Sequence, residues 1–126
     1  MEHNYNATLK VDDKLSFDEK RKLFCYSEGN CFVVLSTKNI KSCTVAADIN
    51  SISESYFNKK IVEGIGVVYF VKDTECFSKA VMQTDVFLQI YFYDENKKIK
   101  CYKKKYDNQT KEVYNIMSRI NKIIIQ

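Results

Sequence analysis

The last third of the chain, residues 86–126, constrains the fold more than any other stretch. Residues 86–93 (VFLQIYFY) are rich in β-branched and aromatic side chains, which favour strands. The turn-forming residues 94–96 separate this run from a second one at 98–103, where apolar and basic side chains alternate. The pattern therefore predicts two antiparallel strands joined by a turn.

A helix is predicted directly after this hairpin, at about 108–124. Asp107 and Asn108 can cap its first turn, because their side chains accept hydrogen bonds from free backbone N–H groups. Apolar residues then recur at helical spacing along one side, at Val113, Met117, Ile120 and Ile124. A helix with one apolar side must cover another element, and the neighbouring strands predict that this element is a sheet.

Short strands with turns between them fill the preceding part of the chain. The polar stretch 12–19 suits an exposed loop or one helical turn, and 56–63 fits either a short helix or a loop crossing the sheet. Seven or eight strands at spacings of roughly 8 to 12 residues are typical of an antiparallel sandwich or barrel. Besides the final hairpin, alternating or fully apolar runs predict strands at 4–11, 23–26, 31–36, 40–49, 67–71 and 76–82.

The composition is that of one globular domain. A chain of 126 residues, 45% hydrophobic and 29% charged, can bury one core, so residues 1–126 are expected to form a single domain with strands over about 4–105. The sequence contains no run of 18 or more apolar residues, and its start lacks the charged and apolar segments of a signal peptide. We therefore expect a cytoplasmic protein.

The residue types that carry catalysis or bind metals are poorly arranged for either. The one histidine, His3, lies beside the chain terminus, so a nucleophile–histidine pair is not expected. The five cysteines include no C-x-x-C pair, and the acidic residues cluster in turns where water solvates them. Gly64 and Gly66 lack the rest of a dinucleotide-binding fingerprint. The sequence predicts no enzyme activity, no cofactor and no metal site.

The order of elements, a β meander closed by one C-terminal amphipathic helix, resembles the pleckstrin-homology-like superfold. The resemblance lies in the step at 48–52 (DINSI), the hairpin at 86–105 and the lead at 106–108 (YDN) into a helix with three inward residues, Val113, Met117 and Ile120. It implies a half-open barrel of two antiparallel sheets that the final helix plugs at one end. The tryptophan that this family typically carries inside the helix is absent here.

Within that superfold, the length, the last hairpin and the helix are similar to those of the apicomplexan inner-membrane-complex sub-compartment proteins. Abundant residues with A/T-rich codons, such as lysine and asparagine, also indicate an A/T-rich genome. These proteins attach to membranes through acylation of an N-terminal Met-Gly-Cys-type segment, whereas this sequence begins with Met1 and Glu2. The resemblance implies a scaffold at the inner membrane complex that is tethered in another way, or an acylated segment outside this sequence.

Two basic clusters are candidates for anion binding, and the first is Lys20-Arg21-Lys22 at the start of the strand predicted at 23–26. In phosphoinositide-binding members of the superfold, a lysine on the first strand and basic residues on the second hold the lipid headgroup. The resemblance assigns these parts to Lys10, Lys20 and Lys22. The three basic residues stand consecutively instead of alternating, so a solvated strand end is the alternative.

The second cluster places six lysines within residues 97–105, and along a strand Lys98 and Lys100 share one face. Such a face attracts lipid headgroups, acidic proteins or nucleic acid. Eighteen lysines against two arginines, and a net charge of only +4, argue against sequence-specific nucleic-acid binding. Lysines on an edge strand also prevent sheet-to-sheet aggregation, which is the structural alternative.

Tyr91 and Tyr93 are candidates for a partner surface. If Leu88, Ile90 and Phe92 face the core, these tyrosines face outward, where aromatic side chains mark interfaces unless another segment covers them. The sequence thus predicts a non-catalytic scaffold or membrane-proximal adaptor with a protein partner, and it does not specify the oligomeric state. The alternatives are a basic module for phosphoinositides, anionic surfaces or RNA, and a small enzyme subunit of another α+β fold.

Overall fold

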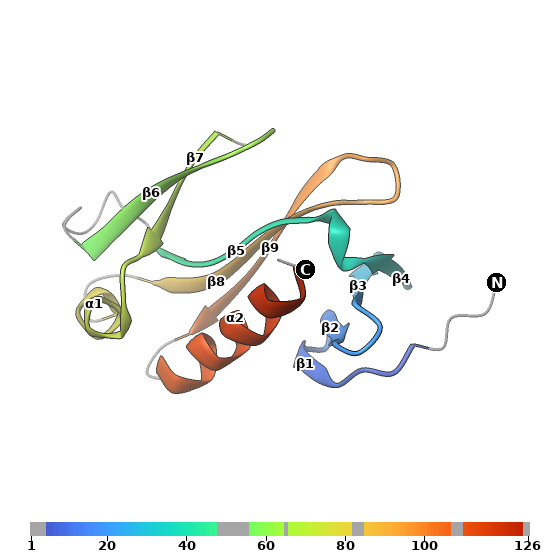
Figure 1. The fold of residues 1–126 in the computed structure, drawn as a ribbon, viewed down its shortest axis with the longest axis horizontal. Helices are drawn as coiled ribbons and strands as arrows, with labels where there is room; N and C mark the ends of the chain where they lie inside the picture. Colours follow the sequence, from blue (N-terminus) through green and yellow to red (C-terminus); the bar gives the residue numbers. More distant parts are fainter. Residues whose placement is uncertain (1–4, 48–55, 65, 82–84, 107–109, 125–126) are drawn as a thin grey trace.

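The computed structural model describes residues 5–47, 56–64, 66–81, 85–106 and 110–124. These residues form a mainly β protein with antiparallel sheets and a C-terminal helix, as the sequence predicts (Figure 1). In chain order the described elements are β1 (Leu9–Asp12), β2 (Leu15–Asp18), β3 (Leu23–Glu28), β4 (Cys31–Ser36), the 3-10 turn η1 (Thr37–Asn39), β5 (Ile40–Ala47), β6 (Phe57–Val62), β7 (Gly66–Val71), α1 (Thr74–Val81), β8 (Val86–Tyr93), β9 (Ile99–Tyr106) and α2 (Thr110–Ile124).

The first four strands form one antiparallel sheet in the order β1-β2-β3-β4. The tight connection between β3 and β4 uses Gly29 at φ 63°, a backbone conformation that glycine adopts without a Cβ clash. The prediction of a loop or helical turn at 12–19 is wrong, because this stretch contains β2. Its two apolar residues, Leu15 and Phe17, are both buried, and two alternating positions suffice for a four-residue strand.

A second antiparallel sheet has the order β5-β8-β9, so the predicted hairpin of residues 86–105 is confirmed. Along β8, the side chains of Leu88, Ile90 and Phe92 are buried, as expected for the core-facing side. On β9 the alternation is unusual, since the outward positions include Ile99, which is 37% exposed, while Lys100 is half-buried. The inner side of β9 therefore carries lysines that need polar partners.

Strands β6 and β7 form a hairpin that stands between β5 and β8 in the chain. It pairs with neither of the two larger sheets among the described residues. It lies on one side of the β5-β8-β9 sheet, and α2 lies on the other (Figure 1). The prediction of a helix or loop at 56–63 is therefore wrong. Only Phe57 and Val62, at the two ends of β6, are buried; the four residues between them are exposed, so the strand carries no alternation that the sequence could display.

The stretch 76–82, predicted as a strand, lies largely in the helix α1. The side chain of Asp73 caps this helix by accepting a hydrogen bond from the N–H of Cys76 at 2.8 Å. Phe77 and Ala80, three residues apart, are completely buried, and that spacing places them on one helical side. The strand prediction is therefore wrong, although the sequence contains both the cap residue and the helical spacing of the buried pair.

The terminal helix α2 is confirmed, and its buried side packs on the sheets through Val113, Ile116, Ile120 and Ile123. Met117 and Ile124, predicted as core residues, are only half-buried because the buried stripe is rotated slightly away from them. The predicted caps Asp107 and Asn108, and the predicted step at 48–52, lie outside the described residues.

Contacts between aromatic rings and between polar groups join the two main sheets. The ring of Phe92 on β8 lies 5.3 Å from Phe24 and 4.8 Å from Tyr26, both on β3. At the sheet margins, the hydroxyl of Tyr102 donates to the Asp12 carboxylate at 2.6 Å. The ammonium of Lys104 donates to the carbonyl of Val11 at 2.8 Å, so this inward lysine of β9 serves the structure.

Candidate functional site

The first predicted basic cluster, Lys20 to Lys22, lies in the turn between β2 and β3. Arg21 is committed to an internal partner: its guanidinium Nη1 and its backbone N–H each lie 3.1 Å from a carboxylate oxygen of Asp18, which is completely buried. Burial alone would raise the pKa of Asp18, but hydrogen bonds from the backbone N–H groups of Asn6 and Arg21 and from the Arg21 guanidinium outweigh it, and the pKa falls below its usual value. Lys20 is exposed.

Lys10, the other residue that the resemblance assigns to a headgroup site, is exposed on β1. Its ammonium lies 3.8 Å from the carboxylate of Asp13 in an ion pair that water surrounds. Lys10 and Arg21 thus each have an acidic neighbour within three residues on their own strand or turn. Lys20 and Lys22 are thus the members of this predicted headgroup site that have no acidic partner among the described residues.

The second predicted cluster divides into exposed and engaged lysines. Lys98 is exposed. Lys100 is half-buried, and its ammonium lies 3.1 Å from Glu28 and 3.8 Å from Asp94, so it joins β9 to the end of β3. With Lys104 bound to a backbone carbonyl, the lysines of β9 form a less open basic face than their number predicts.

The predicted partner surface of Tyr91 and Tyr93 is half-buried on β8. Burial raises the pKa of Tyr91, whose neighbour across the strand pair is Cys101. Tyr93 lies beneath the β6–β7 connection: its hydroxyl lies 2.8 Å from the point where a Cβ on Gly64 would stand, and the ammonium of Lys41 lies 5.3 Å from its ring centre. Another segment of the chain therefore covers part of this surface.

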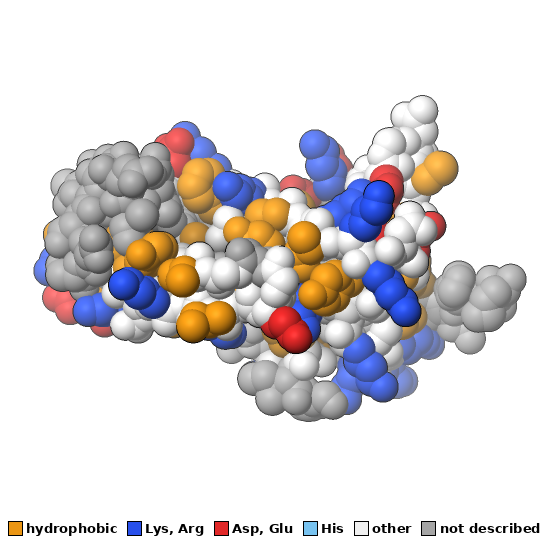
Figure 2. All heavy atoms as spheres, turned by 90° about the horizontal axis from the view of Figure 1, so that it is seen from above, with side chains coloured by type: hydrophobic (Ala, Val, Ile, Leu, Met, Phe, Trp, Pro, Cys, Tyr) orange, Lys and Arg blue, Asp and Glu red, His pale blue; other side chains and the backbone are white. Residues whose placement is uncertain are grey.

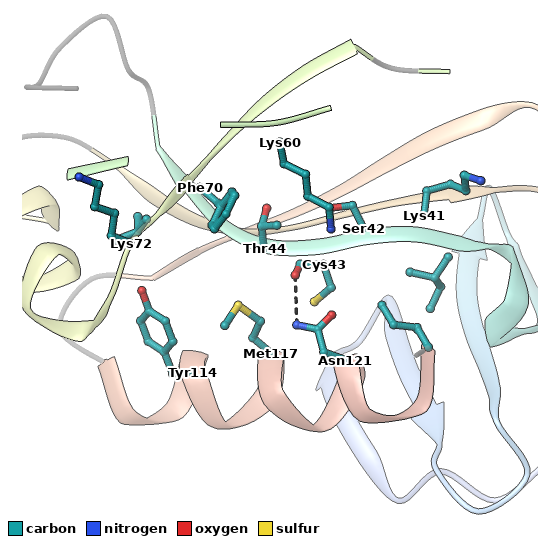
Figure 3. Close-up of a pocket in the computed structure, with 13 residues that line it drawn as sticks. Lys41, Ser42, Cys43, Thr44, Lys60, Phe70, Lys72, Tyr114, Met117 and Asn121 are labelled. Carbon is teal, nitrogen blue, oxygen red and sulfur yellow. Dashed lines mark hydrogen bonds between the residues drawn. The ribbon is translucent and has the colours of Figure 1, made fainter. Parts of the chain in front are cut away.

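A groove that the sequence does not reveal runs along β5, between the β6–β7 hairpin and α2. Its volume is about 510 Å³, which is within the range of ligand sites. Figure 3 shows side chains from all three sides directed toward this space. Apolar side chains make up much of the lining, namely Ile40, Phe70, Val71, Met117 and Ile124.

Two hydroxyls in the groove have no hydrogen-bond partner among the described residues. They belong to Ser42, which is 1% exposed, and Thr44, which is 6% exposed, and both residues lie on β5. A buried hydroxyl without a partner costs roughly 1 to 3 kcal/mol relative to one that is hydrogen-bonded. Native proteins contain few such groups, and ordered water or a bound molecule can supply the missing partners.

The groove follows the outer edge of β5, because among the described residues β5 pairs only with β8. At the middle of this edge, the side-chain amide of Asn121 on α2 donates to the carbonyl of Cys43 at 3.3 Å (Figure 3). The helix thereby occupies one of the edge's free backbone acceptors. A molecule in the groove therefore contacts mainly side chains, because the helix already binds part of the free edge of β5.

The groove is basic. Lys41, Lys60 and Lys72 line it, and the first is partly neutralised by Glu63 at 3.6 Å. Lys60 reaches from β6 toward Ser42 (Figure 3), and its charge acts on the groove floor. Burial raises the pKa of the Cys43 thiol, and the ammonium of Lys60 opposes that rise.

Tyr114 closes the end of the groove nearest α1. Its hydroxyl donates to the carbonyl of Asp73 at 3.2 Å, and its ring packs edge-on against Phe77 with centres 5.8 Å apart. Burial, followed by the nearby charge of Asp73, raises the pKa of Tyr114 to about 12. This tyrosine is therefore a neutral hydrogen-bonding wall at physiological pH.

Comparison of the chain with protein-family models, with curated proteins and with solved structures returned no match. Within the described part of the chain, no group of three or more histidine, cysteine and acidic side chains gathers as a metal site would require. None of the helices in the described ranges is long and apolar enough to cross a membrane. His3 lies outside the described residues.

Proposed function

We propose that the protein is a non-catalytic binding module of the pleckstrin-homology-like kind. The arrangement that supports this is a four-stranded antiparallel sheet, followed in the chain by a three-stranded one and by a C-terminal helix that packs against β5. In this interpretation the sheets form the half-open barrel, and β6, β7 and α1 are an insertion between the first and second strands of the second sheet. The module works as an adaptor, and its site is the groove along β5.

The occupant of the groove that its chemistry supports best is an acidic segment of a protein partner. The single observation that carries this proposal is the pair of buried hydroxyls of Ser42 and Thr44, which lack partners among the described residues, beside the ammonium of Lys60. A carboxylate brings two strong acceptors and a negative charge, so one carboxylate can accept hydrogen bonds from both hydroxyls and pair with the ammonium of Lys60. The apolar lining provides contact area for the rest of the segment.

The two basic clusters predicted from the sequence are weaker candidates for a specific site than the groove is. Arg21 and Lys100 already bind carboxylates of this chain, and Lys20 and Lys98 stand in solvent. Exposed lysines attract any anionic surface weakly and lose that attraction as salt screens it. These residues supply a general positive field that draws an acidic partner or a membrane, and the groove supplies the selectivity.

The test is a titration of the protein with a fluorescein-labelled peptide rich in Glu and Ser, followed by anisotropy at about 0.15 M salt. We expect saturable binding that a peptide with Gln in place of every Glu does not show. Lys60→Gln removes one charge from the groove and is expected to weaken binding roughly three- to tenfold. Lys79→Gln removes an exposed charge from α1, outside the groove, and is expected to leave the affinity unchanged.

Two results would contradict the proposed function. One is equal binding of the acidic and the neutral peptide. The other is an equal loss of affinity in the Lys60→Gln and Lys79→Gln variants, which would reduce the interaction to a nonspecific field. Binding of inositol phosphates that competes with the peptide at Lys60 would replace the acidic segment with a phosphorylated ligand.

A further inference from the structure

One side of the β6–β7 hairpin faces solvent with apolar side chains. Ile61 and Val67 stand opposite each other across the two strands and are 81% and 56% exposed. The next cross-strand pair on the same side is Lys59 and Tyr69, and the ammonium of Lys59 lies 5.9 Å from the centre of the tyrosine ring. We name these four residues, Lys59, Ile61, Val67 and Tyr69, the hairpin face.

The hairpin face is not explained by packing within the chain. Residues nearer the base of the same side, Phe57 and Val71, are 6% and 4% exposed, so the strand pair does bury its apolar residues where the body can cover them. Toward the tip, the aliphatic side chains stay in water at a free-energy cost. Figure 2, viewed from the hairpin side of the molecule, shows hydrophobic side chains gathered among lysines on this surface.

The charges around the hairpin face are mainly positive. Lys59 lies on the face, and Lys60 and Lys72 are exposed nearby, although their side chains alternate to the opposite side of the strand pair and line the groove. The acidic group at the tip is Glu63, and its carboxylate is paired with Lys41 at 3.6 Å. A partner for this surface therefore combines an apolar interior with negative charge at its boundary.

We propose that the hairpin face contacts an anionic lipid bilayer. Aliphatic side chains at a protruding tip, a tyrosine behind them and lysines around them match the layers of a membrane interface from the acyl chains outward to the phosphates. One aliphatic pair and a tyrosine are far too small for a stable protein interface, which buries about 1,600 Å². A bilayer needs no such area or shape fit, and its affinity scales with apolar burial and charge. The four residues of the hairpin face lie outside the proposed peptide groove, and the variants of this face change only Ile61 and Val67, so a failure of this proposal is distinguishable from a failure of the proposed function.

The absence of tryptophan from the sequence provides a clean probe. Ile61→Trp places a single tryptophan on the hairpin face, and Phe32→Trp places one at another exposed position, 65% exposed, in the β3–β4 hairpin. Each protein is titrated with vesicles of phosphatidylcholine alone and with about 30% phosphatidylserine. We expect a blue shift of the emission for Ile61→Trp with the anionic vesicles alone, and no shift for Phe32→Trp.

A second variant measures the apolar contribution. Ile61→Ser with Val67→Ser is expected to weaken binding to the anionic vesicles about tenfold or more while the melting temperature stays close to that of the wild type, because both side chains are exposed. The proposal is overturned by an unshifted Ile61→Trp spectrum, by equal shifts at both tryptophans, or by undiminished binding of the double variant. A blue shift that grows with protein concentration without vesicles would assign the face to a second copy of the chain instead.

Discussion

Arg119 on α2 holds Glu19, the residue after β2, with two parallel hydrogen bonds: Nη2 lies 2.5 Å from Oε1, and Nε lies 2.9 Å from Oε2. The same Nη2 donates to the carbonyl of Thr8 at 3.1 Å. The bond from Arg119 is the largest influence on the Glu19 carboxyl and lowers its pKa. This pair ties the helix that walls the groove to the N-terminal sheet.

Replacing Arg119 with Met keeps the aliphatic stem but removes both hydrogen bonds to Glu19 and the one to the carbonyl of Thr8. Because the Arg119 side chain is 36% exposed, water screens the pair, and we expect the free energy of unfolding to fall by only about 1 kcal/mol. Urea unfolding measures the change. Lys111→Met, an exposed substitution on the same helix, is the matched control and is expected to change stability by less than half as much. Equal effects of the two substitutions would show that the pair contributes nothing.

Acid is expected to destabilise the protein through Asp18 and Glu19. Both carboxyls have pKa values below their usual range in the folded chain, so at acidic pH the folded state binds fewer protons than the unfolded state. Their contribution is complete above the unfolded pKa of about 4 and is lost as the pH falls through the lowered values. Urea unfolding between neutral and acidic pH measures this loss. A Glu19→Gln variant whose stability depends on pH as steeply as that of the wild type would contradict the assignment for Glu19.

The cysteines are expected to react in an order set by burial. Cys43 is 4% exposed, and burial raises the pKa of its thiol, so the reactive thiolate is scarce and inaccessible. Cys31 is exposed at the start of β4. Iodoacetamide labelling followed by mass spectrometry should modify Cys31 in the folded protein and Cys43 only in denaturant. Rapid labelling of Cys43 in the folded state would mean that α2 does not cover β5 as described.

Much of the fold follows from the sequence where periodicity is strong. The hairpin of residues 86–105 and the terminal helix both stand where side-chain alternation and helical spacing place them. The errors fall on short or unusually exposed elements. For α1 the sequence does contain a cap, Asp73, and two buried residues at helical spacing, Phe77 and Ala80. The neighbouring apolar residues make the same stretch resemble a strand.

The candidate site was harder to predict because its parts come from separated segments. In the sequence, Ser42 and Thr44 look like ordinary polar residues that alternate with apolar ones along a strand. Lys60 lies in a stretch that shows neither strand alternation nor helical spacing. Only tertiary packing removes water from the two hydroxyls and brings a lysine beside them. The lysine-rich clusters were conspicuous in the sequence, yet Arg21, Lys100 and Lys104 are used to hold the chain together.

The most direct test of the groove replaces its two hydroxyls by apolar groups of similar shape, in the double variant Ser42→Ala with Thr44→Val. Removing buried hydroxyls that lack partners among the described residues relieves their desolvation cost, so we expect the free protein to keep its stability or gain about 1 kcal/mol. The acidic peptide is then expected to raise the melting temperature of the wild type but not that of the variant, because binding adds stability only where a site remains.

The measurement is therefore the thermal melting of both proteins with and without that peptide. Our account predicts an equal or higher melting temperature for the free variant together with loss of the peptide-induced rise. A variant that melts well below the wild type and still gains full stability from the peptide would contradict it, since the hydroxyls would then serve the fold and not the ligand.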